Sequence, residues 1–254
     1  MVYTYLRSLQ RGVDSTVSQK YTHKAILRIM KAVNDREKIL IYGKGNREGI
    51  CSIAILILVL RYFNADFDYF LVPQGGSREN FIADARTHLD FFTPGVMVSL
   101  NEGFTRSVRE TLDDGETDLV SIGHGDHTME YAFSVEGDTI LKNVFTFSKE
   151  LSINYDTRNI YRYIDLVYLG SEETDVSRDE VLSMGLNRLH VSNNYGIRSL
   201  KKLNSCDEAG LRNLLTPRDN PGSMVDNSRI IIELLTTEDM NRAEQIAKYL
   251  IKSR

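Results

Sequence analysis

The segment KILIYGKGNREGICSIAILILVL, residues 38–60, decides the fold of this chain. Residues 39–42 form a short apolar run of the kind that makes a buried strand. The glycine-rich stretch GKGNREG follows, and an apolar run of helical length begins at Gly49. A strand, a glycine loop and a helix in this order are typical of the ligand-binding edge of an α/β domain. Yet Lys44 stands in this loop where phosphate or metal chemistry usually needs an acid.

The same alternation of patterns continues along the chain. Strand-like runs recur at 68–72, 96–100 and 118–122, and helical patterns at about 78–91 and 105–112 lie between them. Alternating strands and helices indicate a parallel sheet. We therefore predict an α/β fold with a Rossmann-like, mostly parallel sheet over about 37–125, followed by a helical half.

Three segments follow from this organisation. They are an N-terminal helical segment at 1–36, an α/β core at 37–150, and a helical part of the same domain at 151–254. The apolar spacing in the last segment predicts helices at 159–170, 177–191, 207–215 and 228–253. Within the final stretch we expect Thr237 to be the N-cap of the last helix, because two acids follow it in the first turn.

Composition excludes several classes of protein. A formal charge of −4 gives no global attraction to nucleic acid, so any such contact is expected to be local. The longest apolar run, 50–60, is about half of a membrane span, and the N-terminus has no signal-peptide pattern. Two cysteines, Cys51 and Cys206, are too few for a disulfide framework. We expect a soluble, cytoplasmic protein with no membrane contact.

Nucleotide and nucleophile motifs do not fit the glycine loop. Its glycines are spaced one residue wider than in the dinucleotide fingerprint, and Gly49 is not followed by the lysine and hydroxyl of a phosphate-binding loop. No G-x-S-x-G elbow occurs, and neither cysteine has an evident histidine partner. We expect no nucleotide cofactor and no covalent catalysis.

Polar residues follow several of the predicted strands and would meet at one edge of the sheet. They are Lys44, Asn46, Glu48, Asn101, Glu102, His124, Asp126 and His127. A two-metal phosphoesterase needs several carboxylates and imidazoles around its ions, and a lysine among them places a fixed cation where a metal must sit. The stretch HGDH at 124–127 could hold one ion, or it could be an ordinary polar loop.

These loops, laid end to end, resemble those of the DHH phosphoesterase family, in particular its RecJ-like single-strand exonucleases. The first family motif reads G-D-Y-D-A-D-G-I-T-S-x-A-I-L, and residues 43–56 follow it in register. Lys44, Asn46 and Glu48 stand at its three aspartate positions. The second motif is similar to 99–103, where Asn101 replaces the metal ligand.

The remaining motifs are degenerate in the same way. The signature D-H-H falls on Gly123, His124 and Gly125, so that one ligand of three remains. The fourth motif, D-L-V-A-L-G-T-x-A-D, resembles 165–175, with Thr174 at the final aspartate position and Asp175 one residue late. The resemblance runs from about residue 37 to the C-terminus, and the second, DHH-associated domain of RecJ-like enzymes has no counterpart in this sequence.

Degenerate motifs of this kind resemble the RecJ-like proteins of archaeal replication, which are relatives of the eukaryotic cell-division-cycle helicase factor. The resemblance implies a catalytically inactive scaffold at the nucleoid that binds GINS and, through it, supports the MCM helicase. It implies no cofactor. The alternative is a residual nuclease or phosphoesterase that uses Mn²⁺ or Mg²⁺, with Glu48, His124, Asp126, His127 and Asp175 as the remaining candidates.

Passive binding of single-stranded DNA is a further possibility that is compatible with a scaffold. The most basic neighbourhood is GIRSLKK at 196–202, and Lys44 and Arg47 add charge at the old substrate edge. The candidates are Lys44, Arg47, Arg198, Lys201 and Lys202. A solvated helix face would explain the same charges.

Overall fold

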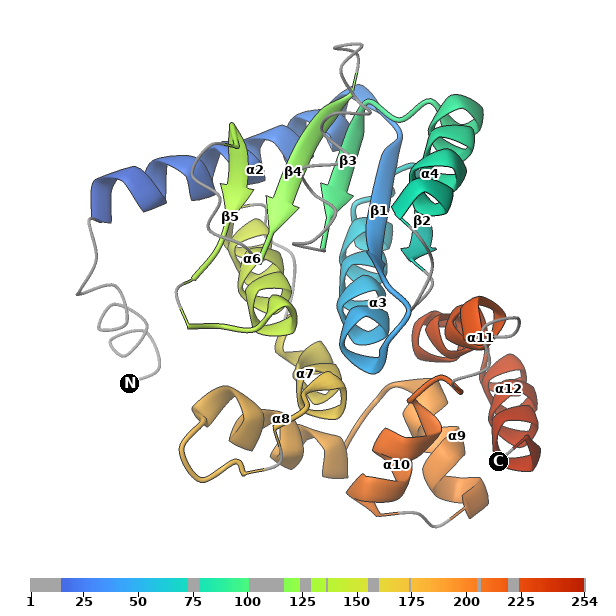
Figure 1. Cartoon of the computed structure of the whole chain (residues 1–254). Coiled ribbons are helices and arrows are strands. Elements are labelled where there is room, and N and C mark those ends of the chain that lie inside the picture. Colours follow the sequence, from blue (N-terminus) through green and yellow to red (C-terminus); the bar gives the residue numbers. More distant parts are fainter. Residues whose placement is uncertain are drawn as a thin grey trace.

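The sheet lies at the centre of the molecule and consists of parallel strands (Figure 1). The computed structural model describes residues 15–72, 78–100, 117–123, 129–135, 137–154, 160–173, 175–204, 207–218 and 224–253. Within these residues the strands are β1 (Ile39–Lys44), β2 (Phe67–Val72), β3 (Val96–Ser99), β4 (Asp118–Ile122) and β5 (Tyr131–Phe133), in the order β2-β1-β3-β4-β5. All neighbours are parallel. The order reverses between β1 and β3, which is where open α/β sheets bind ligands.

Helices cover both faces of this sheet because side chains alternate along each strand. Ile39 and Ile41 point into the larger core with α2 (Ser15–Asp35), α3 (Arg47–Tyr62) and α6 (Ile140–Asn154). Leu40 and Tyr42 point to the other face, where α4 (Arg78–Phe92) packs. Helix α3 is apolar on nearly all sides because it is buried between the sheet and the helices that follow.

The helical half lies at the carboxyl ends of the strands (Figure 1). It contains a 3₁₀ turn (Ile160–Tyr163), α7 (Ile164–Gly170), α8 (Glu180–His190), α9 (Tyr195–Asn204), α10 (Glu208–Leu214), α11 (Met224–Thr236) and α12 (Met240–Lys252). Helices α7 and α11 pack on α3. At the α7 contact Gly170 is required, because a Cβ there would lie 2.6 Å from the Cβ of Cys51. One hydrophobic core therefore runs from the sheet into the helical half.

The predicted α/β class, the parallel sheet and the helical half are confirmed. Strand β5 and helix α6 were not predicted, and the helix expected at 105–112 lies outside the described residues. The prediction of Thr237 as an N-cap is wrong. The last helix begins at Met240, and the Asp239 side chain accepts hydrogen bonds from the backbone N–H groups of Asn241 and Arg242. An aspartate two residues from Thr237 is the stronger cap.

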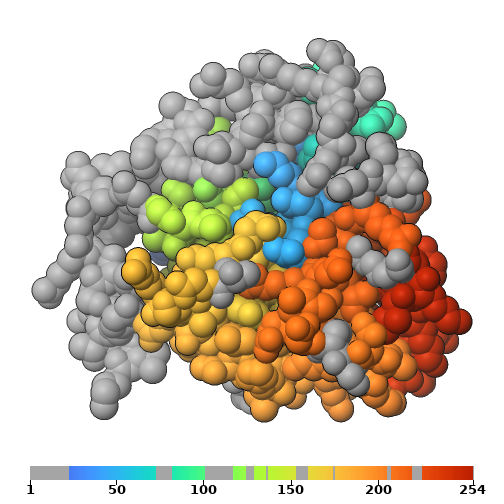
Figure 2. Space-filling view, turned by 60° about the horizontal axis from the view of Figure 1, so that its bottom comes forward, coloured from blue at the N-terminus to red at the C-terminus, as the bar shows by residue number. Residues whose placement is uncertain are grey.

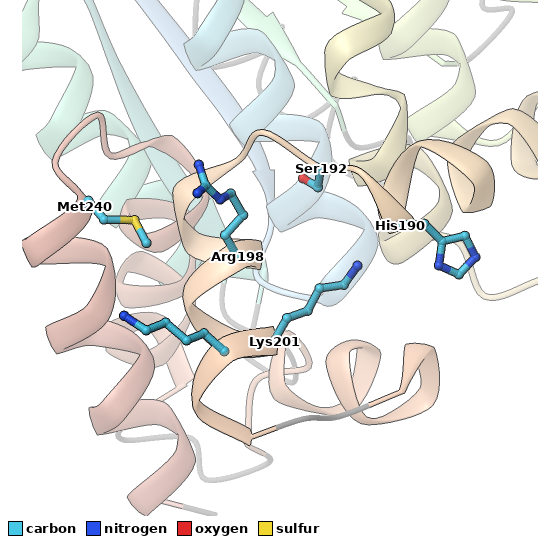
Figure 3. Close-up of a pocket in the computed structure, with 6 residues that line it drawn as sticks. His190, Ser192, Arg198, Lys201 and Met240 are labelled. Atoms are coloured by element: carbon cyan, nitrogen blue, oxygen red, sulfur yellow. The ribbon is translucent and has the colours of Figure 1, made fainter.

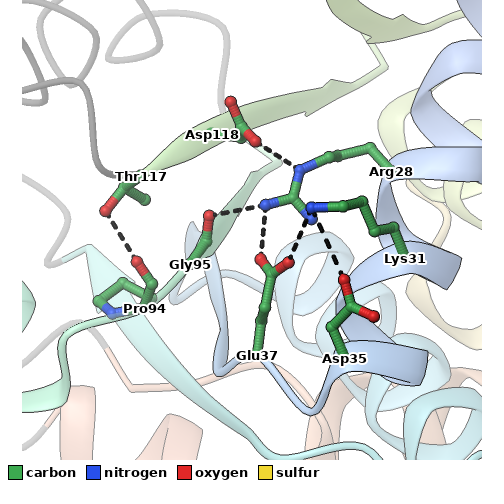
Figure 4. A network of polar contacts seen from close by, with 8 residues as sticks. All are labelled: Arg28, Lys31, Asp35, Glu37, Pro94, Gly95, Thr117 and Asp118. Carbon is green, nitrogen blue, oxygen red and sulfur yellow. Dashed lines mark hydrogen bonds and ion pairs between the residues drawn. The ribbon is translucent and has the colours of Figure 1, made fainter.

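A polar network fastens α2 to the amino-terminal edge of the sheet (Figure 4). Arg28 is 7% exposed, and its guanidinium donates to the carboxylates of Glu37 and Asp118 and to the carbonyl of Gly95. Lys31 adds ion pairs to Glu37 and Asp35 from the solvent side. Gly95 has no room for a side chain, since a Cβ would lie 2.5 Å from Oε2 of Glu37. This edge is opposite to the candidate site, so we assign the network to stability.

In the part of the chain that the structure describes, no helix combines the length and the apolar character needed to cross a membrane.

Candidate functional site

The glycine loop after β1 is held by its own backbone and by the start of α3. The Asn46 side-chain oxygen accepts a hydrogen bond from the Gly49 N–H at 2.9 Å and so caps α3. Gly49 is required because a Cβ there would lie 2.1 Å from the Lys44 carbonyl oxygen. The Gly45 carbonyl accepts from the buried Ser228 hydroxyl of α11 at 2.9 Å. The loop is therefore fixed as a helix start.

Lys44 is the last residue of β1 and is exposed at the carboxyl edge of the sheet. Its ammonium forms no ion pair with Glu48 or Asp175, two acids that could have balanced its charge. In the space-filling view, light-blue atoms from around residue 50 reach the surface between the yellow-green atoms around α6 and the orange helical half (Figure 2). Lys44 thus places a fixed positive charge at this edge, at the position that resembles the first aspartate of the DHH motif.

Arg47 connects this loop to the segment that follows α7. Its guanidinium donates to the hydroxyl of Thr216 at 3.1 Å and to the carbonyl of Ser171 at 3.1 Å, and it pairs with Glu172 at 3.0 Å. The Arg47 side chain is only 13% exposed. The structure therefore places this nucleic-acid candidate in contacts within the chain.

A second arginine, Arg212 of α10, holds the same segment from inside. Arg212 is 6% exposed, lies over the ring of Tyr168 at 4.3 Å, and donates to the carbonyls of Tyr168 and Glu173. Burial lowers the pKa of the Arg212 guanidinium from its ordinary value. Together the two arginines close the segment 171–173 onto α7 and the glycine loop.

Glu48 and Gly123 both meet the start of α6. The Glu48 carboxylate accepts a hydrogen bond from the Leu141 N–H at 3.4 Å, where the helix dipole favours a negative charge. Gly123 has a φ of +99°, and a Cβ there would lie 3.0 Å from Cγ1 and 3.1 Å from Cα of Ile140. A side chain at Gly123 would therefore have a strained backbone and would press on the start of α6, which would have to move by a few tenths of an ångström.

The fourth motif supplies one buried and one exposed acid. Asp165, in the first turn of α7, is 1% exposed and accepts from the Ser192 hydroxyl at 2.5 Å and from the Leu166 N–H at 3.0 Å. Burial raises the pKa of Asp165 above its ordinary 3.8, against the lowering effect of these hydrogen bonds. Asp175 is exposed and accepts from the Ser177 N–H, and this hydrogen bonding lowers the pKa of Asp175.

Because the Asp165 pKa is raised in the folded state, the parent protein loses stability as the pH rises from about 3.8 through the folded pKa. Asp165→Asn removes the buried charge and keeps one carbonyl oxygen, which can accept from either the Leu166 N–H or the Ser192 hydroxyl. We expect the free energy of unfolding of this variant to be about 1 kcal/mol higher than that of the parent at pH 7. Urea unfolding at several pH values should show this advantage shrinking toward pH 4. An advantage that does not change with pH would contradict the assignment.

Cys51 is fully buried in α3, and burial raises the pKa of its thiol to about 12. A thiol that stays protonated at neutral pH is a poor nucleophile. The buried thiol therefore serves the packing of α3 in the core.

Most of the remaining motif residues named in the sequence, and the second cysteine, lie outside the described residues. They are Asn101, Glu102, His124, Gly125, Asp126, His127, Thr174 and Cys206. Among the residues that the structure does describe, no group of three or more His, Cys, Asp or Glu side chains could hold a metal ion. Two of the candidate ligands, Glu48 and Asp175, are among these described residues. Each accepts a hydrogen bond from a different backbone N–H group, that of Leu141 and that of Ser177 respectively.

A comparison with protein families finds no match, and no curated protein matches the sequence. Solved structures do match. RecJ from Thermus thermophilus in complex with Mn²⁺ has a TM-score of 0.74 at 18% identity, covering 92% of this chain and 37% of that one. Exonuclease RecJ bound to manganese has a TM-score of 0.69 at 19% identity, with coverages of 92% and 65%.

The DHH domain of a member of the s1p family of ribosomal proteins is also similar, with a TM-score of 0.61 at 13% identity and coverages of 96% and 62%. The chain thus spans between 37% and 65% of the length of these three proteins. At such identities the likeness concerns the fold, and the fold is the RecJ-like DHH fold.

Proposed function

We propose that this chain is a catalytically inactive RecJ-like DHH protein that acts as a scaffold in DNA replication, binding the GINS complex and thereby supporting the MCM helicase. The observation that carries the proposal is the condition of the glycine loop. At the three positions that resemble the motif's aspartates stand an exposed ammonium, an amide used as a helix cap, and a carboxylate directed to the start of α6.

This set of groups does not fit a pair of divalent ions. An ammonium has no lone pair to offer, and the Asn46 oxygen already accepts the Gly49 N–H. Hard cations such as Mg²⁺ and Mn²⁺ are held mainly by carboxylate oxygens. Arg47 and Arg212 further fill the edge with contacts inside the chain. We therefore derive no metal-dependent step for this loop, and we assign its polar groups to holding the fold.

The scaffold role is tested by affinity capture of the tagged full chain from its native cell extract after nuclease treatment, which removes bridging by DNA. We expect GINS subunits at near-stoichiometric amounts, with MCM subunits in smaller or equal amounts, and neither with the tag alone. Quantitative mass spectrometry measures both. Absence of GINS from the captured material would overturn the replication assignment.

A residual metal-dependent single-strand nuclease or phosphoesterase is the second candidate. It is favoured by Glu48, which is an acid at a position that resembles a motif aspartate and whose carboxylate makes one long hydrogen bond within the part of the chain that the structure describes. Glu48, His124, Asp126, His127 and Asp175 would then surround one ion. This candidate requires Mn²⁺ at one equivalent on the purified chain, lowered by Glu48→Gln. A chain that retains no Mn²⁺ after gel filtration would remove it.

A further inference from the structure

A basic pocket of about 310 Å³ lies in the helical half, between the end of α8, the exposed side of α9 and the start of α12 (Figure 3). His190 and Ser192 come from the end of α8 and the turn after it, and Met240 is the first residue of α12. The other lining residues are Arg198, Lys201 and Lys202 of α9. Sequence reasoning named these three cations, but the pocket also needs residues from two other segments of the chain.

The three cations of the pocket differ in whether a neighbouring group already occupies them. Lys202 forms an ion pair with Glu244 of α12 at 2.7 Å, and the Lys201 ammonium donates to the Leu189 carbonyl. Arg198 pairs with no acidic side chain among the described residues, and its guanidinium lies 6.0 Å from the ring of Tyr195. Figure 3 shows it pointing between Met240 and Ser192. Arg198 therefore offers a planar donor group to a ligand.

The walls of the pocket are held in place by buried contacts. Ser192 is 8% exposed and bonds to Asp165 in α7, and Asn194 caps α9 while donating to the Leu235 carbonyl at 2.7 Å. Gly196 lets α9 lie against α11, since a Cβ there would be 2.3 Å from the Leu234 carbonyl oxygen. A pocket whose walls are already fixed loses little entropy when it binds.

The surroundings favour a single localised anion with an apolar neighbour. Glu244 borders the pocket, and Asp239 caps the helix that supplies Met240, so a polyanion would meet acids close to the cations. Val191 stands between the lining residues His190 and Ser192 in the sequence, and the Tyr195 ring lies 6.0 Å from the Arg198 guanidinium. These two side chains expose 64% and 36% of their surface. A carboxylate matches the guanidinium fork, and Met240, Val191 and Tyr195 suit an apolar side chain.

We propose that this pocket docks an acidic peptide segment of a protein partner, with a carboxylate paired to Arg198 and an apolar side chain against Met240. The proposal deepens the proposed function. It rests on that function in one respect, the choice of a protein as the ligand. It also gives the basic residues of α9 a role other than binding the phosphates of single-stranded DNA.

The test uses the full chain and a fluorescein-labelled short peptide in which one Asp and one Glu flank a single Leu, so that the probe carries a localised charge beside an apolar side chain. We expect fluorescence polarisation to show binding that weakens about tenfold, or about 1.4 kcal/mol, in Arg198→Glu. The matched control is Lys248→Glu, which reverses an exposed charge on α12 outside the pocket and should change binding by less than about twofold. Circular dichroism confirms that each variant is folded.

Three results would overturn the proposal. They are no binding of the acidic peptide, equal binding of the same peptide with Asn and Gln in place of its acids, and equal weakening by Lys248→Glu. Binding of labelled oligodeoxythymidylate that depends on Arg198 while the peptide fails would assign the pocket to nucleic acid instead. Neither GINS nor MCM is present in this titration. Its result can therefore be interpreted even if the capture experiment finds neither of them.

Discussion

Gly123→Asp introduces an acid at the position that resembles the first residue of the D-H-H signature, and we expect it to destabilise the protein by about 2–5 kcal/mol without producing metal-dependent activity. The backbone at Gly123 has a φ of +99°, which costs a residue with a Cβ about 1–2 kcal/mol. The added Cβ also approaches Ile140 to 3.0–3.1 Å, including its Cα, so the start of α6 must move. Urea unfolding of parent and variant measures the loss.

Gly137→Asp provides a matched control for this substitution. Gly137 also has a positive φ, +81°, but a Cβ there would meet no atom within 4 Å. We expect this variant to lose only about 1–2 kcal/mol, which is the backbone cost alone. Equal losses at the two positions would contradict the argument that a side chain at Gly123 presses on the start of α6.

Arg28→Met should be similarly damaging, with an expected loss of about 2–4 kcal/mol. Removing one partner of a buried charge network leaves the other charges without compensation, at a cost of about 3–5 kcal/mol when all are buried. Here the Glu37 and Asp118 side chains are 22% and 46% exposed, so water recovers part of that cost. Lys31→Met, at the 64% exposed cation of the same network, should cost about 1 kcal/mol or less.

The pH dependence of the free energy of unfolding identifies the acid that pairs with Arg28. Burial raises the pKa of Glu37, but the hydrogen bond and charge of Arg28 outweigh burial and hold that pKa below its ordinary 4.5. The pair therefore stabilises the parent above pH 4.5, and this contribution is lost as the pH falls through the folded pKa. The difference in free energy of unfolding between the parent and Arg28→Met should therefore become smaller below pH 4.5. A difference that is constant down to pH 3 would exclude Glu37 as the responsible acid.

The sequence predicted the sheet because its strands and helix α3 carry strong, uninterrupted apolar patterns. Residues 38–60 have a strand pattern, a glycine loop and a helix pattern in a row, and each local preference agrees with the final structure. Strand β5 escaped prediction because Tyr131–Phe133 is only three residues long and its pairing with β4 is not local. The cap of α12 was misplaced because threonine and aspartate compete within three residues.

Charged residues were the hardest to place from sequence. Arg28 occupies an amphipathic helix, and Arg47 a polar loop, where charges are usually solvated. The structure buries Arg28 and leaves Arg47 only 13% exposed. The acids and carbonyls that make this possible come from positions such as Asp118 and Ser171, far along the chain. A single sequence does not display such pairings. The same holds for the α9 pocket, which exists only after α8 and α12 have packed beside it.

The central claim, that the metal-binding edge of this RecJ-like fold has been taken over by structural contacts, is tested most directly by a cleavage assay. The purified full chain is incubated with end-labelled single-stranded DNA and Mn²⁺, beside a His124→Ala variant as the matched control. The account predicts no cleavage above that of the variant. Substantial Mn²⁺-dependent cleavage that His124→Ala abolishes would contradict it and favour the residual nuclease.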